Sequence, residues 1–165
     1  MTGTEGKPRT IRTAVVGYGL AGSVFHAPLL ATNASYSLDL IATSDAGRQA
    51  AASSRLPGVK VVRDGAAVLE RAADLDLVVL ATPPLTHHPL AKAALEAGLD
   101  VVVDKPFAVT SGQGQELVDL ARQRGRVLTV FHNRRWDGDF LTLQKLLAAQ
   151  ALGTVTRFES RFERW

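Results

Sequence analysis

One segment near the start of the chain constrains the fold more than any other. The apolar run Ala14-Val15-Val16 leads directly into Gly17-Tyr18-Gly19-Leu20-Ala21-Gly22, which has the spacing Gly-x-Gly-x-x-Gly. In such a segment the first glycine permits a tight strand-to-helix turn, the second lets a pyrophosphate approach the backbone, and the third lets the helix pack closely on the strand. The pattern predicts a dinucleotide site, and a tight turn without a ligand is the alternative.

Short apolar segments alternate with helical segments along the rest of the chain. The expected strands are Arg12–Val16, Leu38–Thr43, Val59–Val62, Leu75–Ala81, Asp100–Val103 and Val127–Phe131. The expected helices are Ala21–Ala31, with a kink or break at Pro28, and Gly47–Arg55, Ala66–Ala73, His88–Ala97 and Ser111–Arg124. This alternation predicts an α/β fold with a doubly wound parallel sheet, the Rossmann type, that is complete by about residue 131.

Polar or conformationally restricted residues follow most of the expected strands. In an open α/β sheet the ligand lies outside the carboxyl ends of the strands. Besides the glycine turn, the segments expected there are Ser44-Asp45, Thr82-Pro83-Pro84, Asp104-Lys105-Pro106 and His132-Asn133-Arg134. We therefore expect them to gather along one edge of the sheet.

Asp45 bears on the choice between NAD and NADP. It lies roughly 20 residues beyond the glycines, where a carboxylate accepts hydrogen bonds from the adenosine ribose hydroxyls. Its charge would repel a 2′-phosphate, which favours NAD slightly. Ser44 and Arg48 could instead hold that phosphate, so NADP stays open. Asp45 could also cap the following helix.

The loop after the fourth expected strand contains two consecutive prolines. Thr82-Pro83-Pro84 has a restricted backbone, and we expect it beside the cofactor, although an ordinary turn would have a similar sequence. Thr86 is expected to cap the next helix. His87 is a candidate for cofactor contact, with a structural role as the alternative.

Lys105 is the strongest single candidate for a catalytic residue. It follows the apolar strand Asp100–Val103, and Pro106 restricts the backbone after it. A cation at this edge could polarise a carbonyl or hydroxyl oxygen and stabilise an alkoxide during hydride transfer. The alternative is a surface lysine paired with Asp104.

Composition excludes several classes of function. The net charge of +3 is spread along the chain, which argues against nucleic acid, and no apolar run is long enough for a membrane span. The chain has no cysteine, which fits a reducing cytoplasm, and no cluster of metal-ligand residues. We expect a cytoplasmic protein that binds a small molecule.

Three motifs in order resemble the glucose–fructose oxidoreductase, inositol dehydrogenase and rhizopine-catabolism (Gfo/Idh/MocA) family. They are the glycine turn, Ala81-Thr82-Pro83-Pro84-x-x-His87 and Asp104-Lys105-Pro106, the last being similar to the family's Glu-Lys-Pro. The resemblance implies an NAD(P)-dependent oxidoreductase that acts on sugars, polyols or related compounds, with Lys105 as the catalytic lysine. It also places Asn133 and Arg134 on the nicotinamide or substrate side.

After Lys105 the sequence differs from the pattern of the family. Family members are about twice as long, and their second domain carries an Asp-x-x-x-His catalytic pair that this sequence lacks. We therefore expect a cofactor domain at 10–131 and, at 132–165, the incomplete start of a substrate domain: a helix over Trp136–Gln150 and a strand over Thr154–Trp165.

Two functions follow from this organisation. The first is the cofactor-binding part of a dehydrogenase that is weak or inactive alone and uses a small-molecule substrate only when a C-terminal domain is supplied. The second is a non-catalytic NAD(P)-sensing or self-assembly module. Because an apolar strand without a partner invites pairing, copies are expected to associate through residues 136–165.

Overall fold

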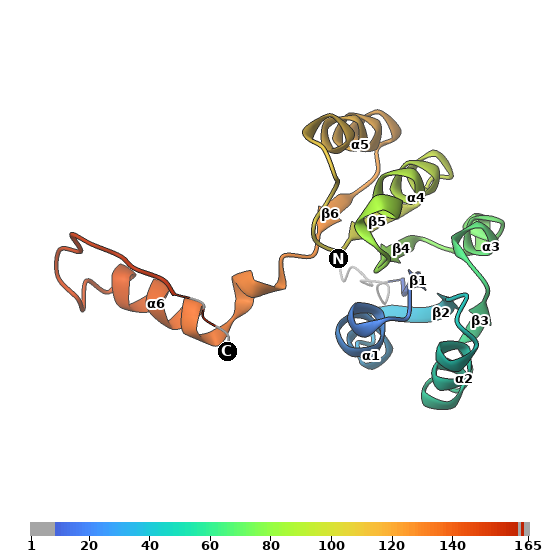
Figure 1. Ribbon diagram of the computed structural model, residues 1–165, viewed down its shortest axis with the longest axis horizontal. Coiled ribbons are helices and arrows are strands. Elements are labelled where there is room, and N and C mark those ends of the chain that lie inside the picture. The colour runs from blue at the N-terminus through green and yellow to red at the C-terminus, as the bar shows by residue number, and fades with distance from the viewer. Residues whose placement is uncertain (1–8, 162, 164–165) are drawn as a thin grey trace, which may run out of the picture. The chain divides into compact units, whose positions relative to one another are not determined.

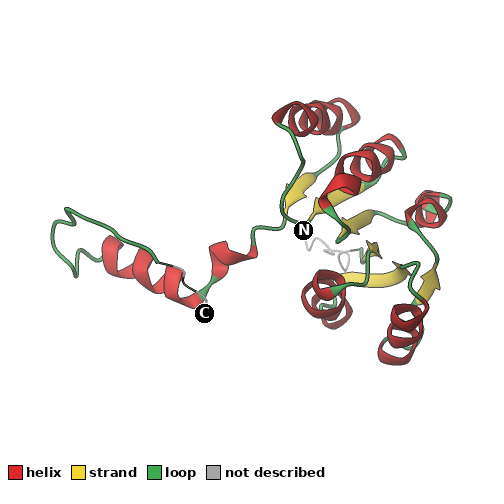
Figure 2. Ribbon diagram, in the orientation of Figure 1, coloured by secondary structure: helices red, strands yellow, loops and turns green. Residues whose placement is uncertain are grey.

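Six parallel strands form one sheet in the order β3-β2-β1-β4-β5-β6 (Figures 1 and 2). The computed structural model describes residues 9–161 and 163. The strands are β1 (Ile11–Val16), β2 (Tyr36–Ala42), β3 (Lys60–Val62), β4 (Leu77–Leu80), β5 (Asp100–Val103) and β6 (Leu128–Val130). The strand order reverses between β1 and β4, as in a doubly wound fold, so the predicted fold class is confirmed.

Helices cover both faces of this sheet. One face carries η1 (Ala21–His26), α1 (Ala27–Thr32) and α2 (Ala46–Arg55). The other carries α3 (Gly65–Leu69), η2 (Ala72–Asp74), α4 (Pro84–Glu96) and α5 (Ser111–Arg124) (Figure 1). Successive residues of β1 face opposite layers: Val15 packs with Ala27 and Ala52, whereas Ala14 and Val16 pack with α3, α4 and α5. The central strands are therefore buried on both faces, which explains why they are almost continuously apolar.

Several helix boundaries differ from the sequence prediction; for example, the helix predicted at Ala66–Ala73 ends at Leu69. The predicted helix at Ala21–Ala31 is present, but its first part, η1, is a π-helix. The predicted break at Pro28 is not found, because the chain is helical without interruption from Ala21 to Thr32 and the change from π-helix to α-helix comes just before Pro28. The prediction that α4 begins at His88 is wrong, since it begins at Pro84 with Pro83 as its N-cap. Thr86 therefore lies inside the first turn of α4 and is not its cap.

An ion-pair cluster joins β1 to β4 at the amino end of the sheet. The carboxylate of Asp76 accepts hydrogen bonds from the main-chain N–H and the Nε of Arg12, at 2.9 and 3.0 Å. Arg9 Nη2 lies 2.7 Å from the same carboxylate. These hydrogen bonds from Arg12 hold the pKa of Asp76 well below its usual range. Asp76 is thus an ionised anchor for the first strand.

The chain divides after Phe131 into two units. The second unit contains η3 (Asn133–Trp136) and α6 (Gly138–Ala148). The predicted strand at Thr154–Trp165 is wrong over the described residues 154–161 and 163, which contain no strand, while residues 162, 164 and 165 lie outside the described part. A strand needs a partner for its backbone hydrogen bonds, and the described part of this unit supplies none.

Candidate functional site

The glycine turn closes so tightly that two of its positions have no room for a side chain. Gly17 has a φ of +99°, and a β-carbon on it would lie 2.4 Å from the carbonyl oxygen of Ala81. A β-carbon on Gly22 would lie 1.9 Å from the carbonyl oxygen of Gly17. The first helix therefore packs directly against the end of β1, as the spacing of the glycines predicts.

A cavity of about 810 Å³ lies at the carboxyl ends of the first four strands. Its volume is in the range of small-molecule sites. The lining comes from four successive strand ends and the helix that follows the fourth: Val16–Gly19, Ala42–Ser44 with Arg48, Arg63–Ala66, and Ala81–Pro83 with Thr86, Pro89 and Leu90. The tight glycine turn at Gly17–Gly22 thus adjoins the cavity, at the sheet edge where a dinucleotide binds in this fold.

Of the three residues after β2 that were considered for the adenosine ribose, two line the cavity and one does not. Ser44 and Arg48 line the cavity, and a β-carbon on Gly19 would lie 3.8 Å from Nη1 of Arg48. Asp45 is not part of the lining. Its carboxylate accepts the main-chain N–H of Arg48 at 2.8 Å and so caps α2. The capping role considered for Asp45 is the one that the structure contains.

Residues that the sequence analysis did not single out also line the cavity. Arg63 brings a second guanidinium, and Asp64 caps α3 by accepting the main-chain N–H of Ala67 at 3.0 Å. Their place in the sequence could have predicted this, because Arg63 and Asp64 directly follow β3, in the same kind of position that Ser44 has after β2. The third strand end contributes to the cavity as the others do.

The loop after β4 is fixed by a buried histidine. Thr82 and Pro83 line the cavity, whereas Pro84 begins α4. His87 is fully buried, with its Nε2 2.8 Å from the carbonyl oxygen of Thr82 and its Nδ1 2.8 Å from that of Pro106. His87 is not part of the cavity lining. Its contacts favour the structural role that was left open for it.

Lys105 lies at the carboxyl end of β5, beside the cavity wall formed by the end of β4. Leu80 pairs with Val103 in the sheet, and the main-chain N–H of Asp104 donates to the carbonyl oxygen of Leu80 at 2.9 Å. Lys105 is exposed, and its main-chain N–H donates to Oδ1 of Asp104 at 2.8 Å. Within the described residues its ammonium group makes no hydrogen bond or ion pair. Pairing with Asp104, the alternative for this lysine, is therefore not observed.

His26 approaches the other oxygen of Asp104. Its side chain is 5% exposed, and its Nε2 lies 3.9 Å from Oδ2 of Asp104. Its ring packs on that of Phe131 with centroids 4.3 Å apart. Burial lowers the pKa of His26, although the Asp104 carboxylate opposes this shift. His26 is not among the site residues predicted from the sequence.

The remaining candidates are not among the residues that line the cavity. Leu20 is the N-cap of η1 and is 74% exposed, and Ala21 begins that helix. Asn133 and Arg134 belong to η3 in the second unit, where Arg134 Nη1 donates to Asp137 at 2.7 Å. This hydrogen bond raises the pKa of Arg134. The proposed nicotinamide-side roles of Asn133 and Arg134 stay predictions.

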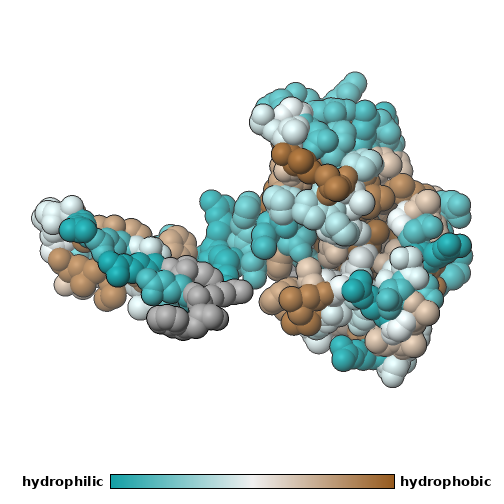
Figure 3. All heavy atoms as spheres, viewed as in Figure 1, coloured by the Kyte–Doolittle hydropathy of each residue, from teal (hydrophilic) through white to brown (hydrophobic). Residues whose placement is uncertain are grey.

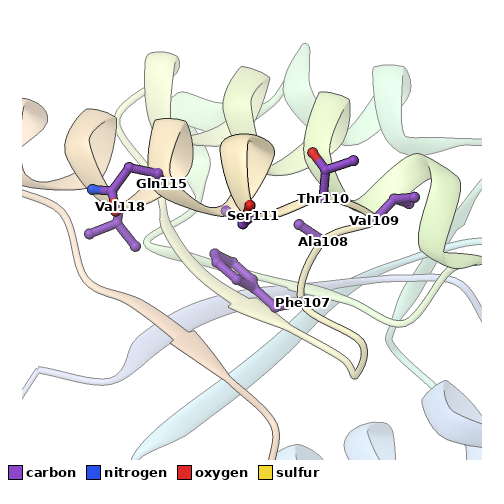
Figure 4. Close-up of a pocket in the computed structure, with 8 residues that line it drawn as sticks. Phe107, Ala108, Val109, Thr110, Ser111, Gln115 and Val118 are labelled. Atoms are coloured by element: carbon purple, nitrogen blue, oxygen red, sulfur yellow. The ribbon is translucent and has the colours of Figure 1, made fainter.

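Two other surface features carry no comparable set of polar groups. A shallower cavity of about 380 Å³ lies beside the start of α5 (Figure 4), and its lining residues include no ionisable side chain. The Thr110 hydroxyl at its rim is occupied in capping α5, because it accepts the main-chain N–H of Gln113. Apolar side chains are also exposed along η1 and α1, namely Leu20, Val24, Phe25 and Leu29. Figure 3 shows a hydrophobic area on the surface of this part of the molecule.

The described part of the chain contains neither a candidate metal site nor a helix that could span a membrane. Over residues 9–161 and 163, no three His, Asp or Glu side chains gather closely enough to hold a metal ion. Nor does any helix in that part of the chain combine the length and the apolar character that crossing a membrane requires.

Comparisons with known proteins agree with this geometry. Residues 11–132 match the family described as an oxidoreductase family with an NAD-binding Rossmann fold, Gfo/Idh/MocA. Over 94% of its length the chain is 51% identical to the uncharacterized oxidoreductase YdgJ of Escherichia coli K12. Over 96% it is 36% identical to the scyllo-inositol 2-dehydrogenase (NADP(+)) IolW of Bacillus subtilis 168.

A solved structure is similar in fold. Biliverdin reductase from Synechocystis sp. PCC 6803, crystallised with biliverdin and NADP⁺, superposes with a TM-score of 0.76 at 28% identity over 84% of this chain. The chain spans less than half of each of these proteins, namely 44% of YdgJ, 43% of IolW and 43% of the biliverdin reductase.

Proposed function

Because the chain belongs to the Gfo/Idh/MocA oxidoreductase family with an NAD-binding Rossmann fold, we propose that its cavity holds the dinucleotide of an NAD(P)-dependent dehydrogenase. One observation carries the proposal: the turn that excludes β-carbons at Gly17 and Gly22 adjoins the cavity of about 810 Å³. Backbone N–H groups at the start of η1 can then bind phosphate oxygens.

The proposed reaction is hydride transfer to or from a sugar, polyol or related hydroxyl or carbonyl compound. The bound nicotinamide supplies or accepts the hydride. Lys105 would donate a hydrogen bond to the substrate oxygen and stabilise the negative charge that develops on it. Its ammonium group makes no hydrogen bond or ion pair with the described residues, which supports this role, as does the name of IolW, an inositol dehydrogenase. A second domain must supply the rest of the substrate site.

For the cofactor, the proposal is NADP in preference to NAD. Two guanidinium groups, Arg48 and Arg63, and the Ser44 hydroxyl line the adenosine end of the cavity, and guanidinium groups bind phosphates well. Asp45, on which the slight preference for NAD was based, is outside that lining, and its Oδ1 accepts the main-chain N–H of Arg48 as a helix cap. IolW and the biliverdin reductase are named with NADP, which adds support.

Titration of the full chain with NADPH and NADH, followed by nicotinamide fluorescence, tests both parts of the proposal. We expect tighter binding of NADPH, and a loss of roughly 10-fold or more in NADPH affinity on Arg48→Ala or Arg63→Ala, because each change removes a charge-assisted hydrogen bond. Arg55→Ala, in the last turn of α2, is the matched control. Equal losses for NADH would rule out the 2′-phosphate role, and no binding of either nucleotide at millimolar concentration would rule out the cofactor site.

The role of Lys105 needs a separate test. We expect Lys105→Met to leave the affinity for NADPH unchanged and to abolish turnover of sugars or polyols, measured by NADPH absorbance once a C-terminal domain is supplied. Turnover by the variant at the wild-type rate would exclude the proposed role. Inactivity of the wild-type chain with every candidate C-terminal domain would count against the dehydrogenase proposal as a whole.

The exposed residues of the second unit favour a second candidate, a non-catalytic NAD(P)-sensing or self-assembly module. Trp136 is 77% exposed, and Phe140 and Leu147 are also exposed. In this alternative, copies associate through residues 136–165. Light scattering with and without NADPH distinguishes the candidates, because a mass that changes with nucleotide supports sensing, and a monomer under both conditions excludes it.

A further inference from the structure

Two buried histidines approach the Lys105 segment from opposite faces of the sheet. His26 belongs to the layer that contains η1 and α1, and His87 belongs to α4 in the other layer. Their side chains are 5% and 0% exposed. They reach the residues on either side of Lys105, since His26 faces Asp104 and His87 faces Pro106.

His87 joins the Lys105 segment to the wall of the cavity. Its two ring nitrogens face two carbonyl oxygens at 2.8 Å, one from Pro106 and one from Thr82, and a carbonyl oxygen can only accept. A neutral ring donates to one of them, and a doubly protonated ring donates to both. In either state the imidazole donates to at least one of the two carbonyl oxygens, which a side chain without a donor could not do.

His26 completes the arrangement on the other side. Its Nε2 has no hydrogen-bond partner in the part of the chain that the structure describes, although it is buried. Oδ2 of Asp104 lies 3.9 Å from this nitrogen, and a shift of under about 1 Å would bring the pair to hydrogen-bonding distance. The other oxygen of Asp104 already accepts the main-chain N–H of Lys105. Asp104 therefore connects His26 to the backbone of Lys105.

The position of His26 depends on an irregular helix. η1 is a π-helix, and such turns are rare and occur frequently at functional sites because they change the direction of side chains. His26 is its last residue and is followed directly by α1. The π-helical turn thus ends at the residue that faces Asp104.

We infer that His26 and His87 are positioning residues that hold the backbone of Asp104, Lys105 and Pro106 from both faces of the sheet and so fix the root of the Lys105 side chain. This inference rests on the proposed role of Lys105 for its functional meaning. Its structural content does not depend on the cofactor. It can therefore be tested on the chain without nucleotide.

The test on His87 uses amides that replace one ring nitrogen each. The side-chain amide of Asn takes the place of Nδ1 and that of Gln the place of Nε2, so His87→Asn keeps a donor toward Pro106 and His87→Gln keeps one only toward Thr82. We expect ¹⁵N relaxation of the full chain to give Lys105 and Phe107 rigid backbone order parameters, about 0.85, in the wild type and in His87→Asn. In His87→Gln and His87→Leu they should fall toward about 0.6.

A purely space-filling role would treat the Asn and Gln variants alike, and equal order parameters in the two would overturn the inference for His87. This comparison remains decisive if His87→Leu does not fold. The control is His88→Gln, which changes the neighbouring histidine that contacts Glu116 and should leave Lys105 and Phe107 unchanged.

For His26, the wild-type chain gives a first answer without any substitution. Long-range ¹H–¹⁵N spectra of the imidazole should show the proton on Nε2, and a proton on Nδ1 alone would overturn donation to Asp104. His26→Gln should then keep the Lys105 order parameter at the wild-type value, while His26→Leu lowers it. If neither variant changes the order parameter, His26 is not a positioning residue. Failure of nucleotide binding would leave all of these readouts intact and would concern the proposed function alone.

Discussion

The glycine turn and the Lys105 segment lie at the same edge of the sheet but are held in different ways. The turn is fixed by main-chain contacts, since the N–H of Gly17 donates to the carbonyl oxygen of Ala42 at 2.8 Å and Gly22 packs against Gly17. The Lys105 segment, Asp104-Lys105-Pro106, is held by side chains. The Asp104 carboxylate accepts the main-chain N–H of Lys105, His26 faces Asp104, and His87 faces Pro106. The close packing of the turn leaves no room for a side chain at Gly17 or Gly22. The contacts around Lys105 instead depend on which hydrogen-bond donor or acceptor each neighbouring side chain provides.

The largest expected effect is on the turn. Gly22→Ala places a β-carbon 1.9 Å from the carbonyl oxygen of Gly17, so β1 and η1 must separate. We expect a loss of at least about 3 kcal/mol in the free energy of unfolding, measured by urea denaturation. Gly112→Ala, in the first turn of α5, is the control, because its nearest neighbour would be 4.0 Å away, and it should be neutral or stabilise by up to about 1 kcal/mol. Similar stability for the two variants would contradict the steric account.

A smaller effect on the free energy of unfolding is expected at the amino end of the sheet, where Asp76 and Arg12 form a partly exposed ion pair. Asp76→Asn should lower the free energy of unfolding by about 1–2 kcal/mol, because hydrogen bonds to a charged acceptor are lost. Since the pKa of Asp76 is lowered by Arg12, its contribution is present above the unfolded-state pKa near 4 and is lost as the pH falls further. Thermal melts at pH 7 and pH 3 check this, and a difference between wild type and variant that stays the same at both values would contradict it.

The smallest expected effect concerns His26. Its pKa is lowered by burial, so the unfolded chain binds a proton more readily than the folded chain. The wild type should therefore lose stability as the pH falls below about 6.5, the ordinary pKa of histidine. His26→Leu should weaken this dependence between pH 8 and pH 5.5 in the same thermal melts. Identical slopes for wild type and variant would show that His26 is not the group responsible.

The contrast between main-chain and side-chain contacts also explains what the sequence could predict. Six strands, their parallel arrangement and the glycine turn follow from local patterns, because apolar runs and glycine spacing act within a few residues. The start of α4 was misplaced by four residues, from Pro84 to His88, because two prolines at a helix start resemble a loop. The strand predicted after Thr154, which the described residues 154–161 and 163 do not form, was inferred from alternation alone, and alternation does not supply a partner.

The candidate site was predicted unevenly for the same reason. Gly17, Ser44, Arg48 and Thr82 line the cavity as strand-end positions suggest, and Arg63 could have been included by the same rule. The relation of His26 to Asp104 could not have been predicted, because it joins residues 78 positions apart and depends on a π-helix without a distinctive sequence pattern. Nor did adjacency reveal that His87 is buried while His88 pairs with Glu116.

The cap at the start of α2 has a consequence for protein engineering. An acidic residue after the second strand is an obvious place to exchange NAD for NADP, but here the carboxylate of Asp45 holds the first turn of α2 through the N–H of Arg48. A substitution there would combine a change in specificity with a loss of helix stability, roughly 1 kcal/mol. Redesign of cofactor choice in this chain is better directed at the guanidinium groups of Arg48 and Arg63, since neither side chain serves as a helix cap.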